Sequence, residues 1–387
     1  MRRALADLPP ELLEEIKPPL EPVAAAVEAE RCLECGGAHA PAPCSVACPA
    51  GIDVPSFVAA IAAGDTARAA DVIFAENLLG GTCARVCPTE LLCEGACVLR
   101  HEGRSPIEIG RLQRHAADAA LAEHRPLRRR EPPTGRTVAV VGAGPAGLAC
   151  AGELAARGHT VTVFDERREP GGLVRFGIAP YRQLDRPLPD EAALVERLGA
   201  SIVLGRRIDR ERLETLAATH DAVVLTVGMG ADATPGLLGE NLDGVWRSLP
   251  FIAALKTGRL PRIGRTVAVI GGGNTAIDVA REAVRIGAEH VTLLYRRTEA
   301  EMPAYPQEVL EAREEGVELR WLTAPTCFLG RHRLEGVECI RMRLGEPDAG
   351  GRKRPEPIAG SEHVVPAETA IIAIGQEPRG EFADLIA

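Results

Sequence analysis

The chain has 387 residues, of which 26% are charged, and its mean hydropathy is close to zero, which is typical of a globular protein with two or three domains. A net charge of −9 and an aromatic content of only 3% argue against a nucleic-acid partner. No run of about 18 apolar residues is without Gly, Pro or charge, and the N-terminal residues contain no apolar signal sequence, so we expect a cytoplasmic protein.

After a polar lead of about 30 residues, eight of the eleven cysteines lie in two groups. The first is Cys32-x2-Cys35-x8-Cys44-x3-Cys48-Pro, and the second is Cys83-x3-Cys87-Pro-x5-Cys93-x3-Cys97. A cytosolic chain does not keep disulfides in this number, and structural zinc uses two C-x2-C pairs where only one is present. C-x2-C followed by two more cysteines, the last before Pro, is typical of 4Fe–4S sites. The spacing therefore predicts iron–sulfur clusters, with enough thiolates for two, and leaves zinc as the alternative.

Helices are predicted between and after the cysteine groups. Asp53 and Asp65 are each expected to cap a helix, and Ser105 is expected to cap a third one. The charged, Pro-rich stretch 125–135 then predicts a domain boundary, so residues 1–130 are expected to form a helical cluster domain.

Residues 137–165 have the pattern of a dinucleotide-binding fold. A β-branched strand leads into Gly142-Ala-Gly144-Pro145-Ala146-Gly147, a small-residue helix follows, and a second strand ends at Asp165. Gly144 would let the backbone approach a pyrophosphate at the helix N-terminus, and the Asp165 carboxylate would accept a hydrogen bond from a ribose hydroxyl. The alternative is a glycine-rich turn that binds nothing.

The pattern occurs twice, because Arg136–Gly142 is repeated as Arg265–Gly271. The second copy continues Gly272-Gly273-Asn274-Thr275-Ala276, with Ala in place of the third glycine. Its second strand ends in Arg296-Arg297 instead of an acid, which favours a nucleotide with a 2′-phosphate. The alternative is that the two arginines form a solvated face.

Several motifs resemble one known family, the NADPH-oxidising flavin and iron–sulfur module found as the glutamate synthase small subunit and as the N-terminal part or small subunit of dihydropyrimidine dehydrogenase. The resemblance covers nearly the whole chain. It rests on Cys83-Ala-Arg-Val-Cys-Pro-Thr-Glu90, Leu92-Cys-Glu-Gly-Ala-Cys97, Ile109-Gly-Arg-Leu-Gln-Arg114, Gly171-Gly-Leu-Val-Arg-Phe-Gly-Ile178 and Tyr295-Arg-Arg-Thr-Glu-Ala-Glu-Met-Pro-Ala304.

The resemblance implies that the two clusters take ligands from both cysteine groups. One 4Fe–4S cluster would be held by Cys32, Cys35, Cys44 and Cys97, and the other by Cys48, Cys87, Cys93 and the side-chain oxygen of Gln113. Cys83 would not be a ligand. Glutamate synthases tend to have Glu where Gln113 stands, so this position is more similar to the pyrimidine enzymes.

The resemblance also implies an α/β fold in which a helical iron–sulfur domain precedes two interleaved Rossmann-like domains. FAD would bind at residues 131–245, completed by 366–387, through Gly142, Gly144, Pro145, Ala146, Gly147, Asp165, Gly172, Leu173 and Arg182. NADP(H) would bind at residues 246–365 and the return segment after them, through Gly271, Gly273, Asn274, Thr275, Ala276, Arg296, Arg297, Ala373, Ile374 and Gly375.

Two features differ from the family pattern. The spacing between Cys35 and Cys44 is longer than usual, and the longer loop contains His39 as a spare candidate ligand. The sequence ends at Ala387, before a Gly-Asp segment that contacts the flavin in the family, so we expect either a fragment or an incomplete flavin site.

The expected function is electron transfer without a catalytic side-chain acid or nucleophile. A hydride from NADPH would reduce FAD, and the clusters would pass single electrons to a partner catalytic subunit of the glutamate synthase or dihydropyrimidine dehydrogenase type. A disulfide reductase is one alternative, although neither nucleotide domain contains the C-x-x-C that it needs. A non-catalytic redox sensor that binds nucleotide and clusters is the other.

Overall fold

The computed structural model describes residues 14–37, 40–347 and 350–378, and they form two compact units. The first unit comprises residues 15–178 and 182–228. The second comprises Glu14, residues 179–181 and the chain from Met229 onward. No helix among the described residues is long and apolar enough to cross a membrane.

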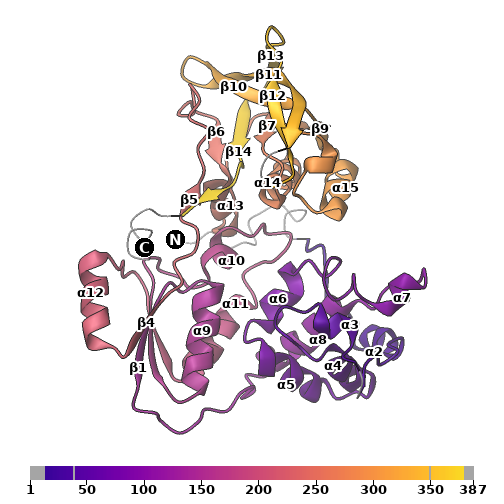
Figure 1. Ribbon diagram of the computed structural model, residues 1–387, viewed down its shortest axis with the longest axis vertical. Coiled ribbons are helices and arrows are strands. Elements are labelled where there is room, and N and C mark those ends of the chain that lie inside the picture. Colours follow the sequence, from indigo (N-terminus) through magenta and orange to yellow (C-terminus); the bar gives the residue numbers. More distant parts are fainter. Residues whose placement is uncertain (1–13, 38–39, 348–349, 379–387) are drawn as a thin grey trace. The chain divides into compact units, whose positions relative to one another are not determined.

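The first unit begins with a group of helices. They are α2 (Pro22–Glu30), α3 (Pro43–Val46), α4 (Val54–Ala62), α5 (Thr66–Glu76), α6 (Gly80–Val86), α7 (Val98–His101) and α8 (Ile109–Ala122) (Figure 1). The caps predicted for α4 and α5 are confirmed, because Asp53 accepts from the Ser56 N–H and Asp65 accepts from the Arg68 N–H.

The cap predicted at Ser105 is wrong. Helix α8 begins four residues later, and the intervening segment is held by α2 instead. Glu28 accepts from the backbone N–H of Glu108 at 2.9 Å, and Arg31 donates to the carbonyl of Ser105 at 2.6 Å. The N–H of Glu108 and the carbonyl of Ser105, which a helix capped at Ser105 would use in its first turn, are therefore bound by α2 and the residue after it.

A four-stranded parallel sheet completes the first unit, with strand order β3-β2-β1-β4. Its elements are β1 (Thr137–Val141), α9 (Pro145–Ala156), β2 (Thr160–Phe164), α10 (Gly172–Phe176), α11 (Leu188–Arg197), β3 (Ala200–Val203), α12 (Arg210–Thr219) and β4 (Ala222–Leu225). One hydrophobic core runs from the helices into this sheet and includes Phe57, Phe74, Leu112, Leu148 and Val163, none of which is exposed. The cysteine-bearing helices and the first dinucleotide fold are therefore one body.

The second unit contains a five-stranded parallel sheet with strand order β6-β14-β7-β8-β9. Its first part consists of β5 (Ala231–Asp232), β6 (Val245–Arg247), α13 (Ser248–Lys256), β7 (Thr266–Ile270), α14 (Asn274–Arg285), β8 (His290–Leu294), the 3-10 helix η2 (Glu299–Glu301), α15 (Pro306–Glu314) and β9 (Glu318–Arg320). Antiparallel strands follow, which are β10 (Thr323–Gly330), β11 (Leu334–Pro347), β12 (Lys353–Pro357) and β13 (His363–Pro366), and then β14 (Thr369–Ile372) and β15 (Gln376–Glu377).

Residues 366–387 are expected to complete the first dinucleotide fold, but strand β14 belongs to the second sheet instead. It lies between β6 and β7, with Ala370 paired to Val245 and Ile371 to Val269. All four of its residues are buried, since a central strand of a parallel sheet is covered on both faces. The expected division at residue 245 is also wrong, because the second unit already begins at Met229. Residues 379–387 lie outside the described part of the chain.

Tyr181 belongs to the second unit although the residues on both sides of the segment 179–181 belong to the first. Its side chain is fully buried, and its hydroxyl donates to Asp278 at 2.6 Å. The guanidinium carbons of Arg281 and Arg285 lie 4.5 and 4.7 Å from the centre of its ring, within cation–π range.

A buried carboxylate joins α11 to the start of α6 within the first unit. One oxygen of Glu191 accepts from the backbone N–H groups of Gly81 and Thr82 at 2.9 Å, and the other accepts from the Thr82 hydroxyl at 2.5 Å. Burial raises the pKa of Glu191 to about 7, although these hydrogen bonds act in the opposite direction.

We predict that Glu191→Gln flattens the pH dependence of stability. Because the folded carboxyl binds a proton more tightly than the unfolded one, its contribution is present below its ordinary pKa and is lost as the pH rises through about 7. A shift of this size corresponds to at most about 3 kcal/mol. The glutamine can still accept from both N–H groups and can donate to the Thr82 hydroxyl.

Melting temperatures measured from pH 5 to pH 8 check this. The difference between wild type and Glu191→Gln should shift in favour of the variant as the pH rises. Glu196→Gln, at an exposed position of the same helix, is the control. Parallel pH profiles for wild type and Glu191→Gln would contradict the prediction.

Candidate cofactor sites

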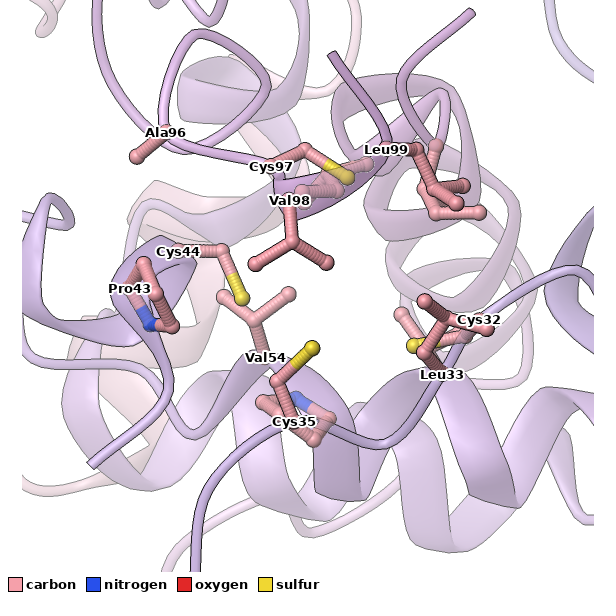
Figure 2. A pocket seen from close by; sticks show the side chains of 14 residues that line it. Cys32, Leu33, Cys35, Pro43, Cys44, Val54, Ala96, Cys97, Val98 and Leu99 are labelled. Carbon is pink, nitrogen blue, oxygen red and sulfur yellow. The ribbon is translucent and has the colours of Figure 1, made fainter. Parts of the chain in front are cut away.

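Four cysteines from both sequence groups line one pocket of the first unit. They are Cys32, Cys35, Cys44 and Cys97, the set that the family resemblance implies for one cluster (Figure 2). The other lining side chains are apolar, among them Leu33, Val54, Val98, Leu99, Ile107 and Ile109. A dry pocket with four sulfur donors and no carboxylate suits a cysteine-bound cluster.

Burial raises the pKa of the Cys44 thiol to about 11 and also raises that of Cys32. The thiols of Cys32 and Cys97 lie close enough to Cys44 to contribute to this shift, after burial. Four thiolates in such a space need a cation among them. Among the described residues, no three His, Cys, Asp or Glu side chains are spaced to hold a single metal ion.

The three cysteines of the second predicted ligand set lie near one another. The hydrogen bond with Cys83, burial, and the nearby thiols of Cys93 and Cys48 raise the pKa of Cys87. Gln113, on α8, is 7% exposed and donates from Nε2 to the carbonyl of Gly80 at 2.7 Å, so its side chain lies against α6, the helix that ends before Cys87. His39, the spare candidate, lies outside the described residues.

Cys83, which the family resemblance excludes from the ligands, lies beside this group. Hydrogen bonds from Cys87, Asn77 and Gln113 lower its pKa, although burial acts in the opposite direction. It is thus a neighbour of two expected ligands, and its exclusion from the ligand set remains a prediction.

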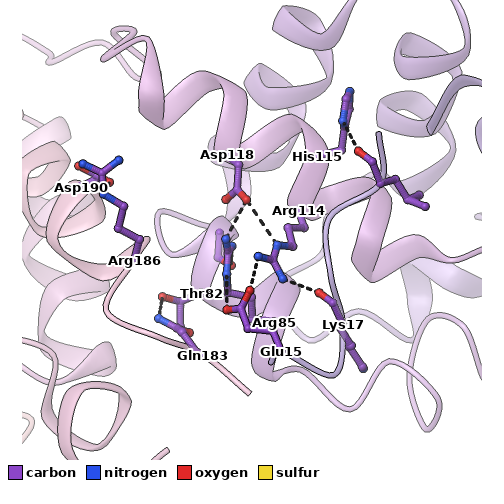
Figure 3. A network of polar contacts seen from close by, with 12 residues as sticks. Glu15, Lys17, Thr82, Arg85, Arg114, His115, Asp118, Gln183, Arg186 and Asp190 are labelled. Carbon is purple, nitrogen blue, oxygen red and sulfur yellow. Dashed lines mark hydrogen bonds and ion pairs between the residues drawn. The ribbon is translucent and has the colours of Figure 1, made fainter. Parts of the chain in front are cut away.

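A buried ion-pair network, which the sequence analysis missed, holds α6 against α8. Asp118 accepts from both Arg85 and Arg114, each only 5% exposed, and Arg114 also donates to Glu15 (Figure 3). Lys17 lies 3.4 Å from the carbonyl oxygen of Cys87 and 2.8 Å from Glu90. Every charge in the network has a partner, so the network links α6 to α8, the helix that carries Gln113, without leaving a buried charge uncompensated.

The glycine loop between β1 and α9 is built by close backbone contacts. A Cβ on Gly142 would lie 2.4 Å from the carbonyl oxygen of Thr226, and one on Gly147 would lie 1.8 Å from the carbonyl oxygen of Gly142. Gly144, by contrast, would meet only the Cα of Gly172, at 3.9 Å. No side chain caps α9, so a pyrophosphate beside Gly144 could accept hydrogen bonds from its first N–H groups.

Other residues predicted for the first fold lie beside this loop or at the strand end. Gly172 approaches Gly144 directly, and Leu173 follows it at the start of α10. Asp165 accepts from the N–H groups of Ala143 and Arg167 at 2.7 and 2.8 Å, which leaves two of its lone-pair positions for a ribose hydroxyl. Arg182 lies half-buried between α10 and α11, and its role in binding remains a prediction.

Thr226 was missed by the sequence analysis. Its hydroxyl donates to the carbonyls of Val141 and Gly142, at 3.0 and 2.9 Å, and so supports the glycine loop from the end of β4. The available signal was a hydroxyl residue at the end of an apolar strand, directly before Val227-Gly228.

The second glycine loop repeats this construction with a different neighbour. A Cβ on Gly271 would lie 2.1 Å from the carbonyl oxygen of Ala373, whereas one on Gly273 would meet nothing within 4 Å. The return segment Ala373-Ile374-Gly375 therefore leaves β14 beside the loop. Asn274 accepts from the N–H of Tyr305 at 2.9 Å. Thr275 and Ala276 lie in the first turn of α14.

The two arginines after β8 differ in burial. Arg296 is exposed, whereas Arg297 is 6% exposed and donates from Nε to the carbonyl of Lys353 at 2.8 Å. The sequence could not distinguish them, because the contact lies 56 residues away along the chain.

Known proteins match both halves of the chain. Residues 11–125 match the family described as dihydropyrimidine dehydrogenase domain II, 4Fe-4S cluster, and residues 136–386 match pyridine nucleotide-disulphide oxidoreductase. The glutamate synthase (NADPH) small chain of Halomonas elongata is 39% identical over 376 residues, which cover 94% of this chain and 79% of that protein. The chain belongs to the glutamate synthase small chain family.

This family assignment makes the chain an NAD(P)H-dependent FAD and iron–sulfur oxidoreductase with a 4Fe–4S domain. The β subunit of an NADPH-Fe(3+) oxidoreductase of Geobacter sulfurreducens is also 41% identical over 350 residues, covering 88% of this chain and 52% of that protein. FprA of Mycobacterium tuberculosis in complex with NADPH shares the fold, with a TM-score of 0.54 and 20% identity over 64% of this chain and 71% of FprA.

We predict that the cysteines separate into two independent sets when they are replaced in pairs. Cys44→Ala together with Cys97→Ala should lose about half of the iron, no more than either change alone, because both side chains face one pocket. Cys44→Ala together with Cys93→Ala should lose nearly all of it.

Iron content and the electron paramagnetic resonance spectra of the reduced protein measure the outcome. The Cys44/Cys97 variant should keep the spectrum of one cluster, the one assigned to Cys48, Cys87 and Cys93. Gln113→Leu should disturb that cluster and leave the other unchanged. Complete loss of iron in the Cys44/Cys97 variant would show that these two residues serve different clusters.

Proposed function

We propose that this chain is the electron-input subunit of a larger enzyme, which receives electrons from NADPH and passes them through FAD and two 4Fe–4S clusters to a catalytic partner subunit. The observation that supports this most is the pocket lined by Cys32, Cys35, Cys44 and Cys97. It lies in the same compact unit as the first dinucleotide fold, so a flavin and the clusters would be held by one body.

Bound flavin supplies the conversion of a two-electron hydride into single electrons. The residues of this chain would bind the flavin and the nicotinamide nucleotide and orient them. The open backbone at Gly144 and the N-terminus of α9 would hold the pyrophosphate, and Asp165 the ribose. Gly273 and the N-terminus of α14 would do the same for the nicotinamide nucleotide.

A partner is expected because the relatives reported above are small or β subunits. The 39% identity to a glutamate synthase small chain supports a glutamate synthase large subunit as partner, whereas Gln113 supports one of the dihydropyrimidine dehydrogenase type. Affinity purification of the native protein under anaerobic conditions would identify the partner by mass spectrometry.

Cofactor content and turnover test the proposal directly. Anaerobically purified protein should contain about eight iron and eight acid-labile sulfide per chain, and NADPH should bleach its flavin absorbance and sustain reduction of a dye acceptor. Zinc without sulfide would contradict the clusters. Bleaching without turnover would favour a redox sensor.

We predict that Arg296 determines the preference for NADPH over NADH. One charge-assisted hydrogen bond contributes about 1.5 kcal/mol, so Arg296→Ala should raise the KM for NADPH about tenfold, and less if solvent screens the exposed guanidinium. The KM for NADH should change little.

Steady-state kinetics with both nucleotides measure this effect. Arg343→Ala is the control, since that arginine is exposed in the same unit but pairs with Glu356. An equal rise in KM for both nucleotides would show that Arg296 does not read the 2′-phosphate.

A further inference from the structure

Strand β12 is tied to the end of β8 by a single buried side chain. The Nε of Arg297 donates to the carbonyl oxygen of Lys353, the first residue of β12, at 2.8 Å. Because Arg297 is only 6% exposed, this bond is sheltered from water and fixes where β12 begins.

The contact brings a second exposed cation to the loop that starts with Arg296. Lys353 is exposed, and its backbone is held by the residue directly after Arg296. Its charge also acts on Glu301, in η2 on the same loop. Hydrogen bonds from Thr298 are the main reason that the pKa of Glu301 lies below its usual range, and the charge of Lys353 adds to them.

The next residue of the strand serves as a natural comparison. Successive side chains in a strand point to opposite faces, so Arg354 lies on the face of Glu356, which is paired with Arg343 at 3.1 Å. Lys353 and Arg354 are thus adjacent and exposed, but their side chains lie on opposite faces of β12.

We propose that Lys353 is a second cationic contact for the 2′-phosphate of NADP(H), alongside Arg296, and that Arg297 is the residue that positions it. This rests on the proposed binding of NADP(H) at the second dinucleotide fold. An ammonium is a compact charge with three donors and suits a phosphate that a guanidinium already holds from one side. A ribose with a free 2′-hydroxyl offers no negative charge to it.

Glu301 gives the contact its selectivity. Its carboxylate is held in place by the N–H and hydroxyl of Thr298, and the charge of Lys353 acts on it. A 2′-phosphate with about two negative charges would attract the ammonium more strongly than the single carboxylate does, whereas a 2′-hydroxyl offers it no charge.

Binding of NADP+ and NAD+ to the oxidised holoenzyme, measured by titration calorimetry, tests the proposal. In Lys353→Gln the Kd for NADP+ should rise about fivefold to tenfold, while the Kd for NAD+ stays within about twofold. Lys353→Arg should keep most of the affinity, and Arg354→Gln should bind both nucleotides as the wild type does. The salt dependence of NADP+ binding should also weaken in Lys353→Gln, because one charge contact is lost.

Three results would overturn the assignment. The first is an equal loss of affinity for NADP+ and NAD+ in Lys353→Gln. The second is a rise in the Kd for NADP+ in Arg354→Gln as large as that in Lys353→Gln. The third is unchanged NADP+ binding in Lys353→Gln. Arg296→Gln separates this inference from the proposed function. If Arg296→Gln weakens NADP+ and Lys353→Gln does not, only the role of Lys353 fails. If neither change weakens NADP+, the placement of the 2′-phosphate at this loop fails as well.

Discussion

The two cysteine groups share a pocket only because the helices between and after them fold back around one core. Phe57 on α4, Phe74 on α5 and Leu112 on α8 are all fully buried in it. Burial of each side chain stabilises the fold by roughly 2 kcal/mol, and without this core Cys97 could not stand beside Cys32. The grouping of the four cysteines therefore depends on ordinary hydrophobic packing, and the ion pairs of Arg85 and Arg114 with Asp118 hold α6 against α8.

Both dinucleotide folds use the same backbone construction with different supports. In each, the first glycine packs against a carbonyl from a neighbouring strand end, Thr226 in one and Ala373 in the other, while the second glycine stays open. The folds differ at the strand ends where nucleotide specificity is expected to be set, since Asp165 follows β2 and a pair of arginines follows β8. A common loop can thus accept the shared pyrophosphate while the strand ends differ.

Local patterns predicted both glycine loops, the caps of α4 and α5, and the presence of two cysteine groups. The grouping of cysteines by cluster came from the family resemblance, and the structure places Cys32, Cys35, Cys44 and Cys97 around one pocket. The sequence could not show that Glu28 holds the segment before α8, that β14 lies in the second sheet, or that Arg297 is buried against Lys353. Each of these depends on a partner far along the chain, and tertiary contacts override local propensity there.

The segment 179–181 has a consequence for how the polypeptide could be divided. The chain enters the second unit at Ala179, returns to the first at Arg182 and leaves again at Met229. A protease that cut between Gly228 and Met229 would sever the obvious linker, yet the N-terminal fragment would still contribute Tyr181, with its hydrogen bond to Asp278 and its contacts with two arginines. The fragments would remain associated without a covalent bond. For the same reason, neither half can be exchanged between relatives by a single crossover at residue 228 without also matching this tyrosine to Asp278, Arg281 and Arg285.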